Sequence, residues 1–248
     1  MPQPLYPSAL RRGSRIAVTA PSSGVPAALH GRLDIVIEHL RKQGFDVDEG
    51  SCLRDEHDSA SAPAAERAAE LTRLLLRDDV HAIIPPWGGE LAIELLDRLD
   101  WTALSAARPK WLLGYSDTST LLLPITLRMG WATAHGPCLM DLAPGQDDPL
   151  TSGAMEALAL SAGERLMQQQ SSHWQLKGTD FAQAPSSTYQ LTETTRWWPL
   201  SEVPDVQFAG RLIGGCIDTL MHIAGTPHGD VRSFIAANAT DAGTVLYL

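Results

Sequence analysis

Apolar and polar positions along the first part of the chain predict a strand followed by a helix. Residues 14–24, "SRIAVTAPSSG", form an apolar run that leads into a turn of proline, serine and glycine. Residues 30–43 carry their apolar side chains at helical spacing: Leu33, Val36, Ile37 and Leu40. Gly44 follows as a typical C-terminal stop. This order indicates a β–α unit.

The same alternation continues to residue 137. We expect further strands at residues 45–50, 80–90, 110–114 and 131–137, and helices at residues 65–79, 90–99 and 117–128. Strands that alternate with helices of this length are typical of a mainly parallel sheet covered on both faces. The predicted fold class is therefore α/β, with residues 1–165 as one doubly wound domain.

The composition changes after this domain. Residues 166–207 are mostly polar and lack helical periodicity, which predicts a linker or a loop-rich crossover. Within residues 208–248 we expect a strand at 208–215, a helix at 216–225 and a strand at 244–248, which together begin a second domain. The chain ends inside the last apolar run, and from this we expect a C-terminal portion to be missing.

Charge and composition exclude several classes of function. The net charge is −10 and the 19 basic residues are scattered, so the basic stripe of a nucleic-acid binder is absent from the sequence. No apolar run reaches the roughly 20 residues that span a membrane, and the first residues lack a signal-peptide core. The three cysteines are far apart in the sequence, which argues against a disulfide framework or a zinc site. We expect a cytoplasmic protein without metal or cofactor and with a small-molecule or peptide partner.

Ser116 stands between an apolar run and a predicted helix, in "WLLGYSDTST". A nucleophile needs this place, at the carboxyl end of a strand and near free backbone N–H groups. The alternative is that Ser116 or Asp117 caps the helix, since serine and aspartate are preferred caps. The stretch also lacks the second glycine of the G-x-S-x-G motif, so spacing alone favours the cap.

The loop "PPWGGE" closes the preceding predicted strand and bears on this choice. In a parallel sheet this loop lies beside the Ser116 turn, and adjacent glycines allow backbone N–H groups to approach a ligand. Gly89 N–H and Asp117 N–H are thus candidates for an oxyanion hole. A plain tight turn at Gly88 and Gly89 explains the sequence equally well.

Five blocks in one order resemble the LD-carboxypeptidase family of serine peptidases: "APSSG", "IIPPWGGE", "PKWLLGYSDTSTLL", "ATAHGPCLMDL" and "GRLIGGCIDTLMHIAGTPHGD". Through "PPWGGE" and "HGPCLMD" the sequence looks most like the microcin C self-immunity branch. The resemblance covers essentially the whole chain. It implies a Rossmann-like N-terminal domain, a smaller β-rich C-terminal domain and a Ser-Glu-His triad.

The resemblance places the nucleophile on Ser116 and the oxyanion donors on Gly89 and Asp117. In the family the glutamate directly follows an apolar strand like "TVLYL" and the histidine lies beyond it, so this sequence stops one position short of the glutamate. His135 is the internal candidate to replace this histidine, but the sequence favours a role in the pocket wall.

The resemblance also suggests substrate contacts. We expect Trp87, Gly88 and His135 to line the substrate site. In the microcin branch a tryptophan stacks on the nucleobase of the substrate, and the resemblance places it on Trp197 or, as a second choice, on Trp198. The alternative is that both aromatic side chains hold the linker against the second domain.

The predicted function is amide hydrolysis through an acyl-enzyme on Ser116. The substrate is a peptidyl- or aminoacyl-nucleotide or the L-D bond of a muropeptide, and the nucleotide is preferred. The alternative is a ligand-binding fragment that lacks the triad glutamate and histidine. Such a fragment would expose an unpaired edge and an apolar face, which predicts either poor solubility or a homodimer.

Overall fold

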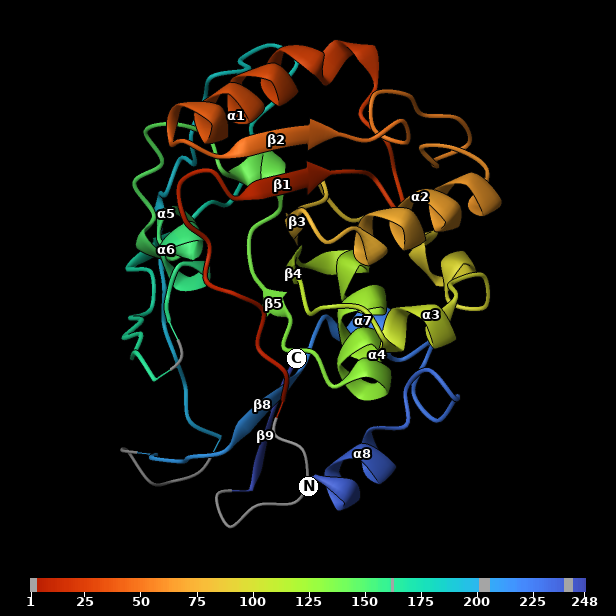
Figure 1. The fold of residues 1–248 in the computed structure, drawn as a ribbon. Helices are drawn as coiled ribbons and strands as arrows, with labels where there is room; N and C mark the ends of the chain where they lie inside the picture. Colours follow the sequence, from red (N-terminus) through yellow and green to blue (C-terminus); the bar gives the residue numbers. More distant parts are fainter. Residues whose placement is uncertain (1–3, 162, 201–205, 239–242) are drawn as a thin grey trace.

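A parallel five-stranded sheet forms the centre of the computed structural model, which describes residues 4–161, 163–200, 206–238 and 243–248. Its strand order is β2-β1-β3-β4-β5. The strands are β1 (Arg15–Val18), β2 (Asp46–Glu49), β3 (Val80–Ile83), β4 (Trp111–Gly114) and β5 (Ala134–His135). Figure 1 shows them stacked from β2 to β5. The expected α/β class with a parallel sheet is confirmed.

Helices cover both faces of this sheet (Figure 1). They are α1 (His30–Lys42), α2 (Ala64–Leu76), α3 (Trp101–Ser105), α4 (Ser119–Met129), α5 (Pro149–Ser152) and α6 (Ala154–Leu158). One buried cluster joins the sheet to α2, α3 and α4, and a second joins it to α1 and α6. The apolar stripe predicted for α1 is buried as expected, because it faces the second cluster.

The helix predicted at residues 90–99 is wrong. The structure has a short 3-10 helix, η2 (Ala92–Leu95), followed by turns. Its start is tied down by tertiary hydrogen bonds on Leu91 N and Ala92 N. Asp100 then caps the separate helix α3 by accepting from Ala103 N at 3.0 Å, so a new helix begins after these turns.

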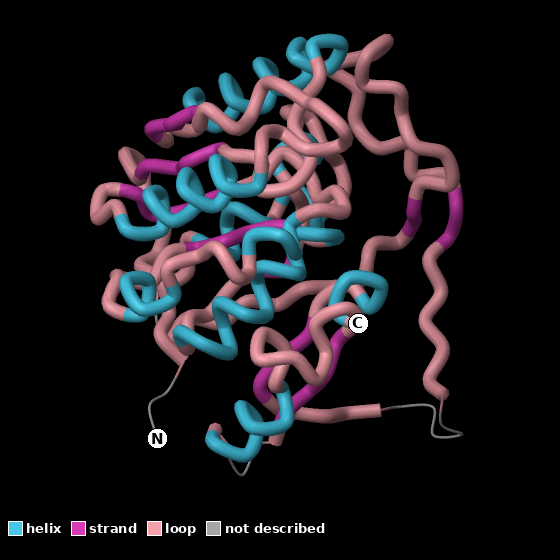
Figure 2. The backbone as a smooth tube through the Cα atoms, turned by 90° about the vertical axis from the view of Figure 1, so that its right-hand side faces the viewer, coloured by secondary structure: helices cyan, strands magenta, loops and turns pink. Residues whose placement is uncertain are grey.

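Residues 166–207 were predicted to be loop-rich, and the part of them that the structure describes is mostly loop (Figure 2). A small antiparallel pair, β6 (His173–Trp174) with β7 (Glu193–Thr194), interrupts it. The fully buried Arg32 of α1 holds this segment: its guanidinium donates to the carbonyls of Pro185 and Ser187 and stacks on Phe181. The segment is therefore bound to α1 through Arg32.

The last part of the chain contains β8 (Arg211–Gly214), α7 (Ile217–Leu220), α8 (Val231–Ala237) and β9 (Thr244–Tyr247). Strands β8 and β9 pair in parallel. The helix predicted at 216–225 is mostly wrong, because only four of its residues are α-helical and turns follow. The domain boundaries at 165 and 207 stay a prediction.

The small β8–β9 sheet leaves apolar side chains in solvent. Leu212 and Leu246, one on each strand, are 71% and 59% exposed. Such residues favour association with an apolar partner. The homodimer stays a prediction, which light scattering across a concentration series tests.

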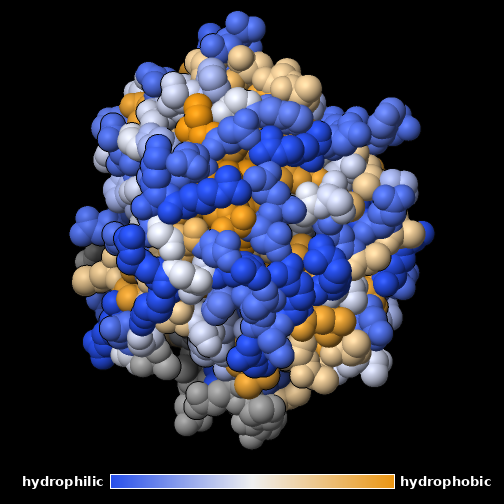
Figure 3. All heavy atoms as spheres, turned by 45° about the horizontal axis from the view of Figure 1, so that its top comes forward, coloured by the Kyte–Doolittle hydropathy of each residue, from blue (hydrophilic) through white to orange (hydrophobic). Residues whose placement is uncertain are grey.

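Much of the remaining surface is polar. The face in Figure 3 is largely hydrophilic, with smaller hydrophobic groups between the charged ones. None of the helices in the described ranges has the length and apolar composition that crossing a bilayer requires.

Glu70 of α2 makes the stability of the fold depend on pH. Its buried carboxylate accepts hydrogen bonds from Thr19 Oγ1, Ser51 N and Cys52 N at 2.5, 2.7 and 3.1 Å. Burial alone would raise the pKa of this carboxyl, but the hydrogen bonds from Ser51, Thr19 and Cys52 outweigh it and lower the pKa.

A carboxyl whose pKa is lowered by folding stabilises the folded protein at any pH above its pKa in the unfolded chain. This stabilisation is lost as the pH falls through its pKa in the folded protein. We expect Glu70→Gln to lower the free energy of unfolding by about 2 kcal/mol at pH 7. Urea unfolding at pH 7 and pH 3 checks this, since the difference in free energy of unfolding between the wild type and Glu70→Gln should be smaller at pH 3. A difference that stays constant would contradict the assignment.

Candidate active site

Ser116 occupies a sharp turn at the carboxyl end of β4. Its φ is +56°, which a residue with a side chain adopts rarely. A strained strand-to-helix turn of this kind lifts a serine hydroxyl out of the sheet in serine hydrolases. The side chain of Ser116 does not cap the following 3-10 helix η3 (Ser116–Thr118), and neither it nor Asp117 caps α4. The structure thus does not support the cap interpretation.

The loop after β3 packs directly against this turn. A Cβ built on Gly88 would lie 2.8 Å from Ser116 Cβ and from Asp117 N, and 2.9 Å from Ser116 Oγ. Gly89 has a φ of +140°, and a Cβ there would lie 2.3 Å from Ser22 Oγ. Both positions therefore require glycine, and the predicted neighbourhood of this loop and Ser116 is present in the structure.

The two candidate oxyanion donors are backbone amides on either side of this contact. Neither Gly89 N–H nor Asp117 N–H donates a hydrogen bond to another group in the described ranges of the chain. Asp117 lies in the first turn of η3, where amides have no partner within the helix. Both amides are thus available to a negatively charged oxygen.

The Asp117 carboxylate connects three loops at this edge of the sheet. It is buried and accepts from Ser22 Oγ at 2.6 Å, from Ala92 N at 2.9 Å and from Thr120 Oγ1 at 2.9 Å. Ser22 follows β1, Ala92 follows β3 and Thr120 lies in the first turn of α4. Charged acceptors form the stronger hydrogen bonds, so this carboxylate fixes the loops relative to Ser116.

His135 lies at the end of β5, and its partner in the pairing register is Gly114. Its Nε2 is 3.8 Å from Cys216 Sγ, and its ring lies 5.2 Å from that of Tyr247. Although part of the residue is exposed, desolvation of the ring lowers the pKa of His135. The sulfur of Cys216 is thus the polar neighbour of this ring, rather than the hydroxyl of Ser116. The contacts fit the pocket-wall interpretation.

Cys216 brings the last part of the chain to the nucleophile turn. Its Sγ accepts a hydrogen bond from Ser116 N at 3.2 Å, and its own N–H donates to Ser119 Oγ at 3.1 Å. The strand β8 ends just before it, at Gly214. The residues after β8 therefore form one wall of the candidate site.

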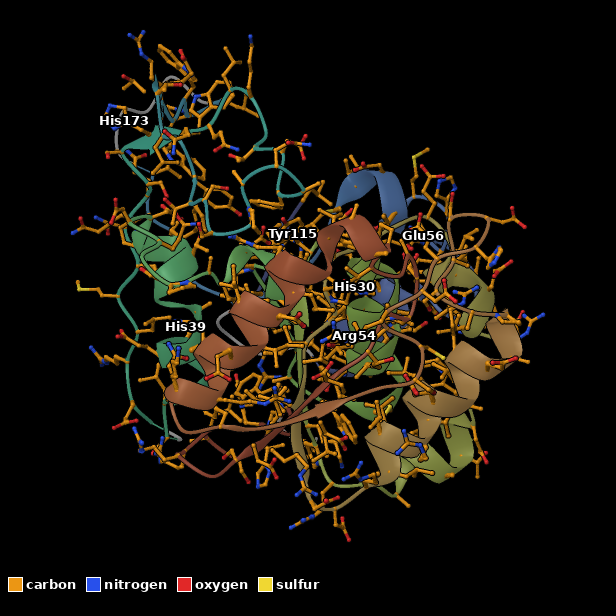
Figure 4. All side chains as sticks on the ribbon, turned by 90° about the horizontal axis from the view of Figure 1, so that it is seen from above. His30, His39, Arg54, Glu56, Tyr115 and His173 are labelled. Atoms are coloured by element: carbon orange, nitrogen blue, oxygen red, sulfur yellow. The ribbon has the colours of Figure 1, made fainter. Side chains whose placement is uncertain are left out.

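A depression of about 440 Å³ opens beside the turn. Its lining includes Tyr115, His135 and Tyr189. Tyr115, labelled in Figure 4, donates through its hydroxyl to Asp141 Oδ2 at 2.9 Å. Burial, together with the nearby Asp141 carboxylate, raises the pKa of both tyrosines, so they are neutral hydrogen-bond donors.

The two predicted aromatic contacts differ in their surroundings. Trp87 is half-buried, and its Nε1 donates to Ser23 O at 3.0 Å, which holds the "PPWGGE" loop. Trp197 is 75% exposed and Trp198 is 74% exposed. This exposure does not support the pinning interpretation, and the structure does not bring Trp197 into contact with Ser116.

Other chemically active side chains lie outside this cluster. His228 pairs with Asp97 at 2.8 Å. His30, at the start of α1, bonds to the carbonyl of Arg54 at 3.1 Å, and Figure 4 shows these two residues close together, with His173 of β6 far from them. Within the described residues no group of three or more histidine, cysteine or acidic side chains could hold a metal ion.

Comparison with known proteins identifies the family. Residues 16–136 match the family described as the LD-carboxypeptidase N-terminal domain, a stretch that runs from β1 through Ser116 to the end of β5. Residues 16–136 form an LD-carboxypeptidase N-terminal domain. The predicted resemblance is confirmed.

Individual relatives extend this match. A putative carboxypeptidase of Vibrio cholerae is 30% identical over 240 residues, which is 90% of this chain and 65% of the relative. A probable murein peptide carboxypeptidase of Bacillus subtilis is 28% identical over 89% of this chain and 60% of its own. A structure of the microcin C7 self-immunity protein MccF in complex with aspartyl sulfamoyl adenosine has a TM-score of 0.72 and 25% identity, covering 91% of this chain and 67% of that chain.

The chain thus spans less than two thirds of the length of the Vibrio cholerae and Bacillus subtilis relatives. The match to the family lies in the part that carries the strand ends around Ser116. The activity, substrates and partners of the whole protein are proposals for this reason.

Sequence reasoning missed three residues of this candidate site: Ser22, Cys216 and Tyr115. Ser22 lies in "APSSG", which was interpreted only as a turn. Polar residues after the first strand of a parallel sheet are a usable signal, because the carboxyl ends of neighbouring strands share one edge. For Cys216, 100 residues from Ser116, the sequence offers no such signal.

Proposed function

We propose that this protein is a serine carboxypeptidase-type hydrolase. Ser116 Oγ attacks the carbonyl carbon of an amide, the C–N bond breaks as the amine leaves with a proton, and an ester on Ser116 remains. Water then attacks the ester, which releases the acid and restores the hydroxyl. The observation that carries this proposal is the strained Ser116 turn at the end of β4, packed against the Gly88–Gly89 loop.

The oxyanion of the tetrahedral intermediate is proposed to bind to Gly89 N–H and Asp117 N–H. Backbone donors aimed at a developing negative charge contribute a large share of such rate enhancements. The absence of other acceptors for these two amides in the described ranges supports this assignment. The positive end of η3 and α4 favours the same charge.

The general base is proposed to be the histidine of the triad that the family resemblance implies, oriented by its glutamate. None of the described histidines forms a hydrogen bond with Ser116 Oγ. Without such a base, we expect the described residues to bind substrate without turning it over. This expectation is also the second candidate function, a ligand-binding module.

For the substrate we propose an aminoacyl- or peptidyl-nucleotide, with the L-D bond of a muropeptide as the alternative. The "PPWGGE" loop and the exposed Trp197, which offers a free aromatic face for a nucleobase, favour the nucleotide. Among the similar proteins, MccF forms a complex with aspartyl sulfamoyl adenosine, and the Bacillus subtilis relative is named for murein peptides.

Active-site labelling tests the proposal. The full-length protein is treated with a fluorophosphonate and its intact mass is measured, with Ser116→Ala as the control. We expect one adduct, absent from the variant, because only an activated serine reacts. A protein without adduct would favour the ligand-binding module.

Product analysis then decides the substrate. The full-length protein is incubated with an aminoacyl sulfamoyl nucleotide and, separately, with a muropeptide tetrapeptide. Release of the amino acid from the nucleotide analogue is expected. Release of D-alanine from the tetrapeptide, with no cleavage of the nucleotide, would reverse the preference.

A further inference from the structure

The hydroxyl of Ser22 lies at the junction of three loops around the candidate site. Ser22 follows β1 and is 2% exposed. Its Oγ accepts a hydrogen bond from Leu91 N at 3.0 Å and donates its single proton to Asp117 Oδ2 at 2.6 Å. A serine hydroxyl has one donor and this one is used on a carboxylate, so its orientation is fixed.

These bonds act on the loop that carries the glycines. Leu91 N is bound to Ser22 Oγ and the next amide, Ala92 N, is bound to Asp117 Oδ2 at 2.9 Å. Of these two consecutive amides, one is thereby held by the β1 loop and the other by the residue that follows Ser116. Gly89, two residues earlier, packs so closely on Ser22 that a Cβ there would lie 2.3 Å from Ser22 Oγ.

We propose that Ser22 is a positioning residue for the reaction at Ser116: its hydroxyl fastens the Gly89 loop to Asp117 and so holds Gly89 N–H and Asp117 N–H at the spacing that an oxyanion needs. The inference rests on the proposed function. Donors must lie within a few tenths of an ångström of their optimal distance, and small displacements of catalytic groups cost large factors in rate.

A neighbouring serine provides a matched control. Ser61 is buried to a similar degree, and its Oγ donates to Ala20 O at 2.6 Å. Ala20 belongs to the same loop after β1 as Ser22. This hydroxyl is bonded to the backbone of the β1 loop and not to Asp117 or the Gly89 loop. Ser61→Ala therefore removes a buried hydroxyl of equal size and leaves the junction intact.

Steady-state kinetics of Ser22→Ala and Ser61→Ala in the full-length protein test the inference. For Ser22→Ala we expect kcat to fall about 10- to 100-fold with KM within threefold of the wild type. The reason is that the two oxyanion donors would no longer be aligned for the transition state, whereas the bound substrate does not depend on them. For Ser61→Ala we expect kcat within twofold of the wild type. Equal losses in the two variants, or an unchanged kcat in Ser22→Ala, would overturn the proposal.

Amide hydrogen exchange provides a readout that does not depend on turnover. In Ser22→Ala, exchange of the peptide that contains residues 87–92 should accelerate at least fivefold, and in Ser61→Ala it should match the wild type. Equal exchange in both variants would overturn the positioning role. A wild type that neither hydrolyses the substrates nor reacts with fluorophosphonate would refute the proposed function instead, and the exchange comparison would still decide the role of Ser22.

Discussion

Replacing Ser116 with alanine should lower kcat/KM for amide hydrolysis by about 10⁴-fold or more, since the nucleophile acts in both chemical steps. Substrate binding should persist, because the depression lined by Tyr115, His135 and Tyr189 remains. Steady-state kinetics of the full-length variant, with a dissociation constant from calorimetry, measures both quantities. Ser105→Ala is the control, a serine on α3 whose hydroxyl donates to Thr102 O within the same helix.

A second variant separates chemistry from strain. Ser116→Gly removes the same hydroxyl, but glycine adopts a positive φ without steric cost. Its free energy of unfolding should therefore be about 1 kcal/mol higher than that of Ser116→Ala, which makes it the more stable variant. Equal stabilities would show that the turn stores no strain. Hydrolysis retained in both variants would contradict the role of Ser116 as nucleophile.

The positions of the strands were predictable because apolar runs that end in glycine, proline or serine are a local signal. Strand β4, predicted at residues 110–114, is observed at Trp111–Gly114. The approach of the Gly88 loop to Ser116 was also predictable, since parallel strand ends meet at one edge. Both features follow from short stretches of sequence and from the topology that they imply.

The misplaced helices show where local signals fail. Residues 90–99 have acceptable helical composition, but hydrogen bonds from Leu91 N and Ala92 N to Ser22 and Asp117 fix the start of the segment in another geometry. These partners are 69 and 25 residues away. Contacts at such separations outweigh helix propensities of a few tenths of a kcal/mol per residue, and periodicity carries no information about them.

Cys216 shows the same limit within the site. The sequence argued only against a disulfide or a zinc site for the cysteines, whereas in the structure the Cys216 sulfur accepts a hydrogen bond from Ser116 N. The docking that brings it there depends on contacts of α7 and β8 with α4. The predicted role of Trp197 depends on a ligand, and its exposure leaves that prediction to experiment.

Replacing Gly88 with alanine should reduce kcat/KM by about 10²-fold or more. Its new methyl group would lie 2.8 Å from Asp117 N and 2.9 Å from Ser116 Oγ, in the space where the nucleophile and an oxyanion donor meet. Relief of this contact requires the β3 loop and the Ser116 turn to separate. We also expect a loss of about 1 to 3 kcal/mol in the free energy of unfolding, as for other overpacked sites.

The matched control is Gly178→Ala, because Gly178 has open space around it and its φ lies outside the range that disfavours side chains. Kinetics and urea unfolding of both variants separate a steric effect at the site from the general effect of glycine replacement. A Gly88→Ala protein that keeps wild-type kcat/KM would show that the contact between the two loops is not where the reaction occurs. Loss of kcat with wild-type substrate affinity would show instead that the space between the β3 and β4 ends serves the transition state, because a methyl group that only blocked the substrate would raise KM.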